Sequence, residues 1–471
     1  MLVPALGLAV ALVVGSAAAS PQTREFADRA AQGDKGALDA LVELVRKEKS
    51  ADAEYELGLM AHEGRGLERN SRQALQLVQR AALKGHADAC NLLGYFHQHG
   101  LGTPVDFPQA LEWYRKGADA GSARAQANLG WFLEQGIAVA KDVAGAAEWY
   151  RKAVAQGLMG VQANLAGLYA SGDGVPKDEV KAIELYKAAL AAGVASVALP
   201  LGRLHEERGN TAEATEYYLA AARGGLADAE WPAGRLLVAV GNPRRNLGQG
   251  VYWLDRVAAR EKIEAVLILA NIFDKGAEVP RDAHLAAGYF RRAADLGDIE
   301  AAYRYALHLE EAPRDSTASV EREDPARWYR QAAEKGHAEA QFRLARRLQS
   351  GDGAARKAAV TWYRKAAEAG QPDAPMPLAI ALDEGGGVAP SPAEALPWYL
   401  KAAESGNAEA LYRLALLYDR GRGTRADFVR ARDYYSRAAA LGHKEAERVL
   451  QRMVGLSAPE GVQLDPFKGM R

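Results

Sequence analysis

Cysteine is nearly absent from this chain, because Cys90 is the only one among 471 residues. A single cysteine excludes an intramolecular disulfide and any zinc site built wholly from cysteine. An excess of charge of one sign is also absent, since 59 Lys and Arg residues are balanced by 60 Asp and Glu residues. Binding to nucleic acid needs a concentrated basic surface, so the sequence predicts no nucleic acid partner. Runs of β-branched residues are scarce after residue 20, whereas alanine and leucine are abundant, which favours helix.

The N-terminus is an apolar run at residues 1–19 without a charged side chain, and it closes on three alanines. Such a run is typical of a secretory signal peptide, so we expect cleavage before Ser20. The apolar stretch is short for a membrane-spanning helix. Because no Lys or Arg precedes it, retention as an uncleaved anchor stays an alternative. Cleavage would leave a periplasmic or secreted protein without an integral membrane domain.

A segment of the form Ala-x-x-Trp-Tyr-x-Lys-Ala-Ala-x-x-Gly recurs along the rest of the chain. The Trp position, sometimes taken by Tyr or Leu, repeats at intervals of about 36 residues. These anchor residues are Leu77, Trp113, Trp149, Leu185, Tyr217, Trp253, Tyr289, Trp328, Trp362, Trp398 and Tyr434. Self-similarity at one such period indicates a repeat architecture, here with about eleven units.

One unit, Ser122 to Gly157, shows the physical logic of the repeat. Small and apolar residues at helical spacing predict a first helix that ends at Gly136. Asp142 is a plausible N-cap of a second helix, which Gly157 stops in a left-handed conformation. The expected inner stripe of that second helix is Ala146, Trp149, Tyr150 and Ala153. Two such helices cannot bury both stripes alone, so stacking with the neighbouring repeats must complete the core.

The repeat resembles a known family in its order of motifs. A Leu-Gly pair is followed by a Gly-x-Gly loop and then by the Trp-Tyr segment, which resembles the Sel-one-like repeat, a relative of the tetratricopeptide repeat. The loop occurs at Gly64-Arg65-Gly66, Gly100-Leu101-Gly102, Gly172-Asp173-Gly174, Gly351-Asp352-Gly353 and Gly421-Arg422-Gly423. The resemblance covers nearly all of the mature chain, and it implies scaffolding and partner binding.

We therefore expect an all-α protein, an α-solenoid with a right-handed superhelix, made of about eleven helix-turn-helix repeats with helical caps. The expected segments are a signal peptide (1–19), an N-terminal helical cap (20–50), regular repeats (51–193), degenerate repeats (194–336), further repeats (337–442), a C-terminal cap helix (443–456) and a flexible tail (457–471). The degenerate part contains Pro200 and Pro232 near the starts of first helices, where proline should kink or delay a helix. Pro377 has the same place in a later repeat, and a polar insertion lies at residues 314–319.

Several residues raise the question of catalysis or metal binding. His86, Cys90, His97 and His99 cluster in one repeat, and two of them share a helix face, as zinc ligands would. Packing explains them better, because His97 has the position that tyrosine takes in other repeats. The Gly-x-Gly loops lack the preceding strand of a phosphate-binding motif. Carboxylate pairs such as Glu206-Glu207 and Glu310-Glu311 indicate a solvated face. We predict no catalytic residue, no metal site and no cofactor.

The predicted binding surface comes from the first helices. The residues two before and two after the Leu of the Leu-Gly pair are four apart, so they share one face. By resemblance to tetratricopeptide arrays, this face lines a concave groove. The predicted partner-binding residues are Tyr55, Tyr95, Trp131, Arg203, Trp231, Arg235, Tyr303, Phe342, Arg346 and Tyr412. Aromatic and arginine side chains are typical of interface hot spots, although several of these rings could instead pack under the next repeat.

Three functions stay open at this point. The first is an exported scaffold or adaptor that binds a segment of a protein partner in the groove. The second is a cell-envelope scaffold that contacts peptidoglycan or exopolysaccharide machinery, because aromatic side chains also suit sugar rings. The third is an enzyme, since some cysteine-rich Sel-one-like proteins have been linked to β-lactam hydrolysis. The paired cysteines of that subfamily are absent here, so we expect no enzymatic activity.

Overall fold

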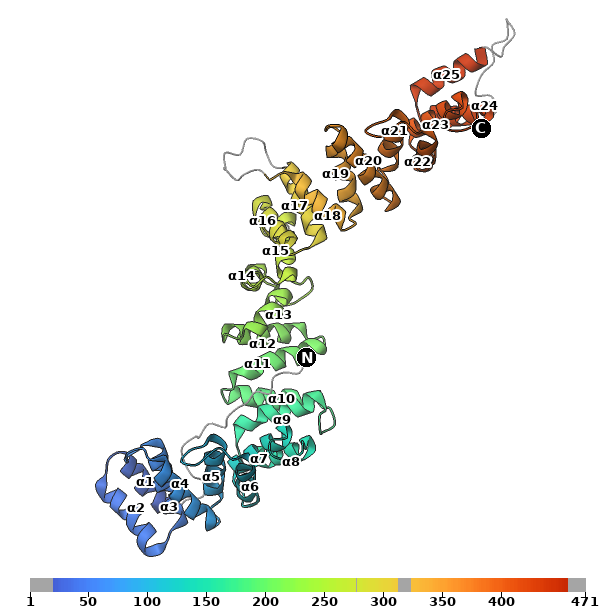
Figure 1. The fold of residues 1–471 in the computed structure, drawn as a ribbon. Helices are drawn as coiled ribbons and strands as arrows, with labels where there is room; N and C mark the ends of the chain where they lie inside the picture. The colour runs from blue at the N-terminus through green and yellow to red at the C-terminus, as the bar shows by residue number, and fades with distance from the viewer. Residues whose placement is uncertain (1–19, 277, 312–322, 456–471) are drawn as a thin grey trace. The chain divides into compact units, whose positions relative to one another are not determined.

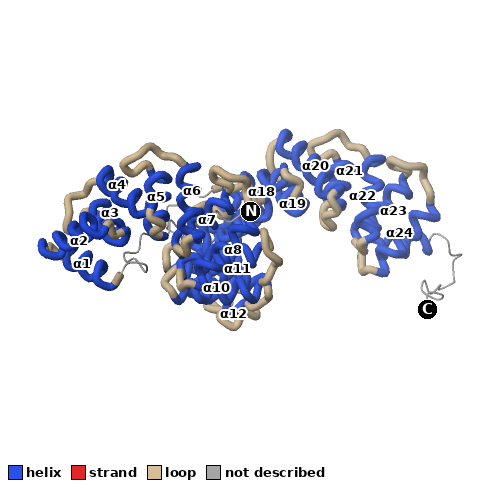
Figure 2. The backbone as a smooth tube through the Cα atoms, turned by 90° about the horizontal axis from the view of Figure 1, so that it is seen from below, coloured by secondary structure: helices blue, strands red, loops and turns tan. Residues whose placement is uncertain are grey.

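The computed structural model describes residues 20–276, 278–311 and 323–455, and these form helices and connecting loops without a strand (Figures 1 and 2). The expected all-α solenoid is confirmed. The predicted signal peptide, the insertion at 314–319 and the tail at 457–471 lie outside the described residues. Of the helices described, none is both long and apolar enough to cross a membrane. The chain divides into two compact units, Met1–Trp253 and Leu254–Arg471, with the boundary inside helix α14 (Leu247–Ala258).

In unit 1, residues 1–253, consecutive helices pack in pairs, and each pair packs on the next (Figure 1). The helices are α1 (Pro21–Ala31), α2 (Lys35–Glu48), α3 (Ala51–Glu63), α4 (Ser71–Leu83), α5 (Ala87–His99), α6 (Phe107–Asp119), α7 (Ala123–Gln135), α8 (Val143–Ala155), α9 (Gln162–Ser171), α10 (Glu179–Ala191), α11 (Ala198–Glu207), α12 (Thr211–Arg223) and α13 (Ala227–Val238). From α3 onward each odd-numbered helix is the first helix of a repeat and the even-numbered helix after it is the second.

Unit 2, residues 254–471, follows the same plan. Its helices are α15 (Ile263–Lys275), α16 (Ala283–Asp295), α17 (Ile299–Glu311), α18 (Pro325–Glu334), α19 (Ala338–Leu348), α20 (Gly353–Glu368), α21 (Pro375–Glu384), α22 (Pro392–Glu404), α23 (Ala408–Arg420), α24 (Phe428–Ala440) and α25 (Lys444–Gly455). The last of these is a first helix without a second helix among the described residues, in the place where the sequence predicts a cap.

Local signals set the helix ends in the repeat that contains α7 and α8. The Ser122 hydroxyl accepts a hydrogen bond from the Ala125 N–H at the start of α7, and Gly136 ends that helix at φ 71°. The Asp142 carboxylate accepts from the Gly145 N–H at the start of α8. Positive φ is costly for residues with a Cβ, which explains glycine at position 136. The expected stop and N-cap are therefore confirmed.

In most repeats the core between the paired helices is built around one tyrosine, whose place Val78, Leu254 and Phe290 take in the others. Tyr150 of α8 is buried, and a Cβ added to Gly130 of α7 would lie only 2.7 Å from its ring. The glycines at Gly94, Gly130 and Gly202 thus make room for a tyrosine ring from the second helix, whereas Gly58 faces Val78. Trp149, which the sequence analysis placed on the inner stripe, is half-exposed, and this expectation is corrected. Neighbouring residues of a helix point about 100° apart, and in this repeat Tyr150 faces the core while Trp149 points aside. In two other repeats both rings are buried, at Trp113-Tyr114 and Trp328-Tyr329.

The Gly-x-Gly loops serve close packing between repeats. Gly102 adopts φ 75°, and a Cβ at this position would lie 2.6 Å from the Ser71 carbonyl oxygen at the start of α4. Gly174 has φ 70°, and its Cβ would lie 2.6 Å from the Ala144 backbone nitrogen of α8. In these two loops the second glycine therefore lets the chain touch the second helix of the preceding repeat, which a residue with a Cβ could not do without displacement. The loop at Gly351-Asp352-Gly353 differs, because an added Cβ at Gly353 would meet nothing within 4 Å.

The prolines of the first helices act in two ways. Helix α11 begins at Ala198, after a 3-10 turn, so Pro200 falls in its first turn, and Pro377 has the same place in α21. Proline is tolerated there because the first N–H groups of a helix have no intrahelical acceptor. The expected late start is confirmed at both positions. Pro232 differs, because α13 begins at Ala227 and continues through it.

Candidate partner-binding surface

In several repeats a hydrogen bond from the buried tyrosine of the second helix holds the end of the first helix. The Tyr114 hydroxyl donates to Gln98 Oε1 at 2.6 Å, and the Tyr150 hydroxyl donates to Glu134 Oε2 at 2.7 Å. Burial raises the pKa of Tyr150, and it also raises the pKa of Glu134. Tyr363 is held in the same way by Gln349, at 2.6 Å. These hydrogen bonds hold the first helix against the second and so fix the positions of the exposed residues of the first helices.

The same bond corrects the interpretation of a solvated face for one carboxylate of each pair, whereas Glu207 and Glu311 are exposed. Glu206 accepts a hydrogen bond from the Tyr218 hydroxyl at 2.8 Å and forms an ion pair with Arg235 of the next repeat. Glu310 accepts from the Tyr329 hydroxyl at 2.8 Å. Both carboxylates are therefore structural links within and between repeats. Their partners lie many residues away along the chain, so the local sequence carried no signal for them.

Three of the predicted binding tyrosines stack on a histidine of the following repeat. The ring centroids are 4.6 Å apart for Tyr55 and His86, 4.5 Å for Tyr303 and His337, and 4.4 Å for Tyr412 and His443. Each histidine also caps the next first helix, because its Nδ1 accepts a backbone N–H three residues ahead. A carboxylate three residues before each tyrosine approaches the histidine Nε2: Asp52, Glu300 and Glu409.

This tyrosine–histidine–carboxylate joint between repeats was missed by sequence reasoning. The available signal was the histidine directly before each of these first helices, at Gly-His-Ala or Gly-His-Lys. Tyr55 is only 2% exposed in the joint. Phe342, at 9%, is buried against Tyr363, with ring centroids 5.9 Å apart. The expectation that these two rings are open to a partner is corrected, because His86 of the next repeat covers Tyr55 and Tyr363 of the same repeat covers Phe342.

The remaining predicted residues are partly or fully exposed to solvent. Tyr95, Trp131 and Trp231 are half-buried, as are Tyr303 and Tyr412 at the edges of their joints. Arg203 and Arg346 are exposed, while Arg235 is paired with Glu206. Their binding role stays a prediction.

A row of register-related positions runs along the first helices of unit 1. Tyr95, Trp131, Gly167 and Arg203 follow one another at intervals of 36 residues, on helices α5, α7, α9 and α11. The Tyr95 ring contacts His99 at 4.3 Å between centroids, and the Trp131 ring contacts Phe132 edge-on at 5.5 Å. At Gly167 only the Tyr186 hydroxyl lies within reach of an added Cβ, at 3.5 Å. The row therefore lacks a side chain directly after Trp131.

Two asparagines accompany this row, and we call the five uncharged residues Tyr95, Asn128, Trp131, Asn164 and Gly167 the neutral face. Asn128 donates through Nδ2 to Asn91 Oδ1 at 2.8 Å, and Asn164 donates to the Tyr150 hydroxyl at 3.3 Å. The Oδ1 atoms of Asn128 and Asn164 accept no hydrogen bond from the described residues. They are acceptors of the kind that an extended peptide backbone can use.

The histidine and cysteine cluster of α5 is accounted for by packing. His86 caps α5 and stacks on Tyr55, and the Cys90 thiol donates to the Ala82 carbonyl oxygen at 3.6 Å. Burial lowers the pKa of His86 and raises the pKa of the Cys90 thiol. Among the residues that the structure describes, no group of three or more His, Cys, Asp and Glu side chains is arranged to hold a metal ion.

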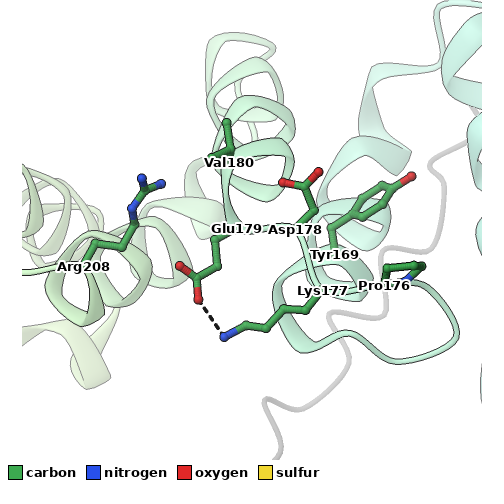
Figure 3. A pocket seen from close by; sticks show the side chains of 7 residues that line it. All are labelled: Tyr169, Pro176, Lys177, Asp178, Glu179, Val180 and Arg208. Carbon is green, nitrogen blue, oxygen red and sulfur yellow. Dashed lines mark ion pairs between the residues drawn. The ribbon is translucent and has the colours of Figure 1, made fainter.

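A hollow of the described surface lies elsewhere, at the loop between α9 and α10 and the end of α11 (Figure 3). It has a volume of about 570 Å³ and is lined by Tyr169, Pro176, Lys177, Asp178, Glu179, Val180 and Arg208. Figure 3 shows that Lys177 and Glu179 form an ion pair, at 2.6 Å. Asp178 is engaged in capping α10 through the Lys181 N–H. Most of the charged groups that line this hollow thus already have a partner, and the lining does not indicate a particular class of ligand.

Comparisons with known proteins agree with this architecture. The stacked helix pairs define a helical repeat protein of the solenoid class, a fold typical of protein–protein interaction scaffolds and not of catalysts. The chain belongs to the Sel1 repeat family. Its family model matches residues 51–86, 87–122, 123–158, 161–194, 202–226, 263–298, 326–337, 338–371, 378–407 and 408–443.

Solved structures include similar proteins. A protective antigen present in uropathogenic Escherichia coli strains, which displays an SLR fold, is 28% identical and covers 89% of this chain and 91% of its own, with a TM-score of 0.51. A Sel1 repeat protein from Oxalobacter formigenes is 24% identical over 51% of this chain and 96% of its own, with a TM-score of 0.39. The chain has no match among curated proteins.

Proposed function

We propose that this protein is an exported adaptor that binds an extended segment of a protein partner along the neutral face of unit 1. The observation that carries this proposal is the half-exposed Trp131 beside the empty position at Gly167. A large ring with open space on one side offers contact area at low entropic cost, as interface hot spots do. The free Oδ1 atoms of Asn128 and Asn164 would accept hydrogen bonds from the main chain of the segment.

The test is capture of the partner from envelope extract by the mature protein, followed by mass spectrometry. Trp131→Ser should weaken capture by about 30-fold, the effect of a hot spot worth ~2 kcal/mol. The matched control is Trp149→Ser, a half-exposed Trp of α8 whose ring contacts Lys152 Nζ at 3.8 Å. The control should capture normally. Equal losses in both variants, or intact capture by Trp131→Ser, would reject the neutral face as the binding surface.

An envelope scaffold that contacts peptidoglycan or exopolysaccharide machinery is the second candidate. The observation in its favour is the same pair of half-exposed rings, Tyr95 and Trp131, which can also stack on sugar rings. Co-sedimentation with purified peptidoglycan separates the two. Retention on the glycan that Trp131→Ser abolishes would favour the second candidate, whereas a captured protein without glycan retention favours the adaptor.

Export is part of the proposal and rests on the apolar run at residues 1–19. Intact-mass analysis of protein from the envelope fraction should give a chain that begins at Ser20. A chain that still begins at Met1, recovered from the cytosol, would contradict export. The third candidate, β-lactam hydrolysis, is checked by incubation with nitrocefin, for which we expect no turnover.

A further inference from the structure

A second hollow lies on the first helices of unit 2, between α17 and α19. It has a volume of about 260 Å³ and is lined by Glu310, Arg343, Arg346 and Arg347, which we call the arginine pocket. Three guanidinium groups and one carboxylate give this lining an excess of positive charge. The volume is below the usual range for a drug-sized ligand, so it suits one or two small charged groups.

Two of the three arginines are held in place by Glu310. Arg343 Nη1 lies 3.4 Å from Glu310 Oε2, and Arg347 Nη1 lies 3.2 Å from Glu310 Oε1. The Tyr329 hydroxyl donates to the same carboxylate, at 2.8 Å. Each arginine has a further anchor, Glu339 for Arg343 at 3.0 Å and Asp324 for Arg347 at 3.1 Å. Their guanidinium planes are therefore fixed before a ligand arrives, which reduces the entropy lost on binding.

Arg346 differs from its two neighbours. Its side chain is exposed, and it forms no ion pair with the described residues. The guanidinium carbon lies 5.9 Å from the centroid of the Phe342 ring, so the aromatic ring supports it from one side. Its N–H donors lie in the guanidinium plane and stay available to an acceptor in the pocket.

We infer that the arginine pocket binds a carboxylate of an acidic segment in the protein partner. This inference rests on the proposed function, because it names the chemistry of the partner. A guanidinium fork matches the two oxygens of a carboxylate or phosphate, and Arg346 supplies such a fork beside two fixed cations. The incoming carboxylate pairs with Arg346, the one guanidinium of the three that forms no ion pair with the described residues.

A protein segment fits the pocket better than nucleic acid does. Glu339 and Asp324 flank the three arginines, so the positive surface is confined to the pocket. A nucleic acid strand requires a continuous positive track along its phosphates, and the whole chain has a formal charge of −1. An acidic peptide needs only one favourable contact for each carboxylate.

The probe is a fluorescein-labelled hexaglutamate peptide, titrated with mature protein at low salt and followed by fluorescence anisotropy. Arg346→Gln should weaken binding about fivefold or more. Arg346→Lys, which keeps the charge but loses the fork, should weaken it about twofold. The matched control is Arg432→Gln, an exposed arginine of α24 that makes the same change in net charge. It should bind like the parent protein.

Every other outcome overturns the inference. Equal weakening by Arg346→Gln and Arg432→Gln would mean general charge attraction, and full binding by Arg346→Lys would mean that the fork is irrelevant. Stronger competition by inorganic phosphate than by unlabelled hexaglutamate would assign the pocket to a free oxyanion. Stronger competition by an oligonucleotide would assign it to nucleic acid. Trp131→Ser should keep hexaglutamate binding, so failure of the adaptor proposal and failure of this inference are separate results.

Discussion

The first helices of the two units share one packing plan but carry different chemistry on their exposed side. In unit 1 the exposed row is uncharged at Asn128, Trp131 and Gly167. In unit 2 three first helices, α17, α19 and α23, carry an arginine paired with a carboxylate of the preceding repeat, as in Arg343 with Glu310. Unit 1 has such a pair at Arg235 of α13 with Glu206. The difference shows that the residues of the repeat motif determine how the helices pack, whereas the residues between the motif positions determine what the exposed surface can bind.

Both units pack their helices in the same way, and the largest loss of stability is expected when the buried tyrosine of a repeat is replaced. Tyr150→Ala should reduce the stability of its part of unit 1 by about 3–5 kcal/mol, because it empties the space beside Gly130. Trp149→Ala should cost only about 1–2 kcal/mol, since that ring is half-exposed. Urea unfolding followed by circular dichroism measures both. A larger loss for Trp149→Ala would show that the wrong ring has been placed in the core.

The sequence could predict the paired helices but not which of the two adjacent rings is buried. Gly136 and Asp142 signal helix ends through their own backbone preferences, so they can be interpreted locally. The burial of Tyr150 depends on Gly130 of the other helix, and the stacking of Tyr303 depends on His337 of the next repeat. The spacing of residues along the sequence does not reveal contacts between repeats. The predicted partner-binding residues therefore include some that are buried between repeats and others that are exposed.

A second difference between the units is a buried carboxyl oxygen without a partner in unit 1, whereas the buried Asp383 of unit 2 forms an ion pair with Arg422. Glu56 of α3 is buried, and its Oε1 has no hydrogen-bond partner among the described residues. Burial raises the pKa of Glu56 from 4.5 to about 7, and Arg65 offsets only part of this effect. Because the folded state holds the proton more tightly, stability is fully present below pH 4.5. It declines as the pH rises towards 7 and stays reduced above that.

Glu56→Gln should therefore stabilise unit 1 at pH 8 by on the order of 2 kcal/mol and give little gain at pH 4. Thermal unfolding at both pH values measures the difference. As a control, Glu148→Gln changes an exposed carboxylate of α8 and should leave the pH dependence unaltered. A gain for Glu56→Gln that is equal at both pH values would contradict a buried, titrating carboxyl group.

The smallest expected effect is the difference between the two units in the stability that is lost when a tyrosine hydrogen bond is removed. Tyr329→Phe removes a hydrogen bond to the Glu310 carboxylate, and Tyr114→Phe removes one to the Gln98 amide. Bonds to charged acceptors contribute about 1.5–3 kcal/mol and neutral ones about 1 kcal/mol, so the first variant should lose more stability. Hydrogen exchange at the ends of α17 and α5 resolves the two losses. Equal losses would mean that the two acceptors are equivalent.

Site-specific photocrosslinking in the native host tests the central claim, that the neutral face of unit 1 holds the partner. A photoreactive amino acid is placed at Asn128 of α7, and, as a control, at the exposed Glu148 of α8. The account predicts one discrete crosslinked protein from position 128 and none from position 148, with the product lost when Trp131 is changed to Ser. A product from position 148 alone, or from both positions regardless of Trp131, would contradict the account.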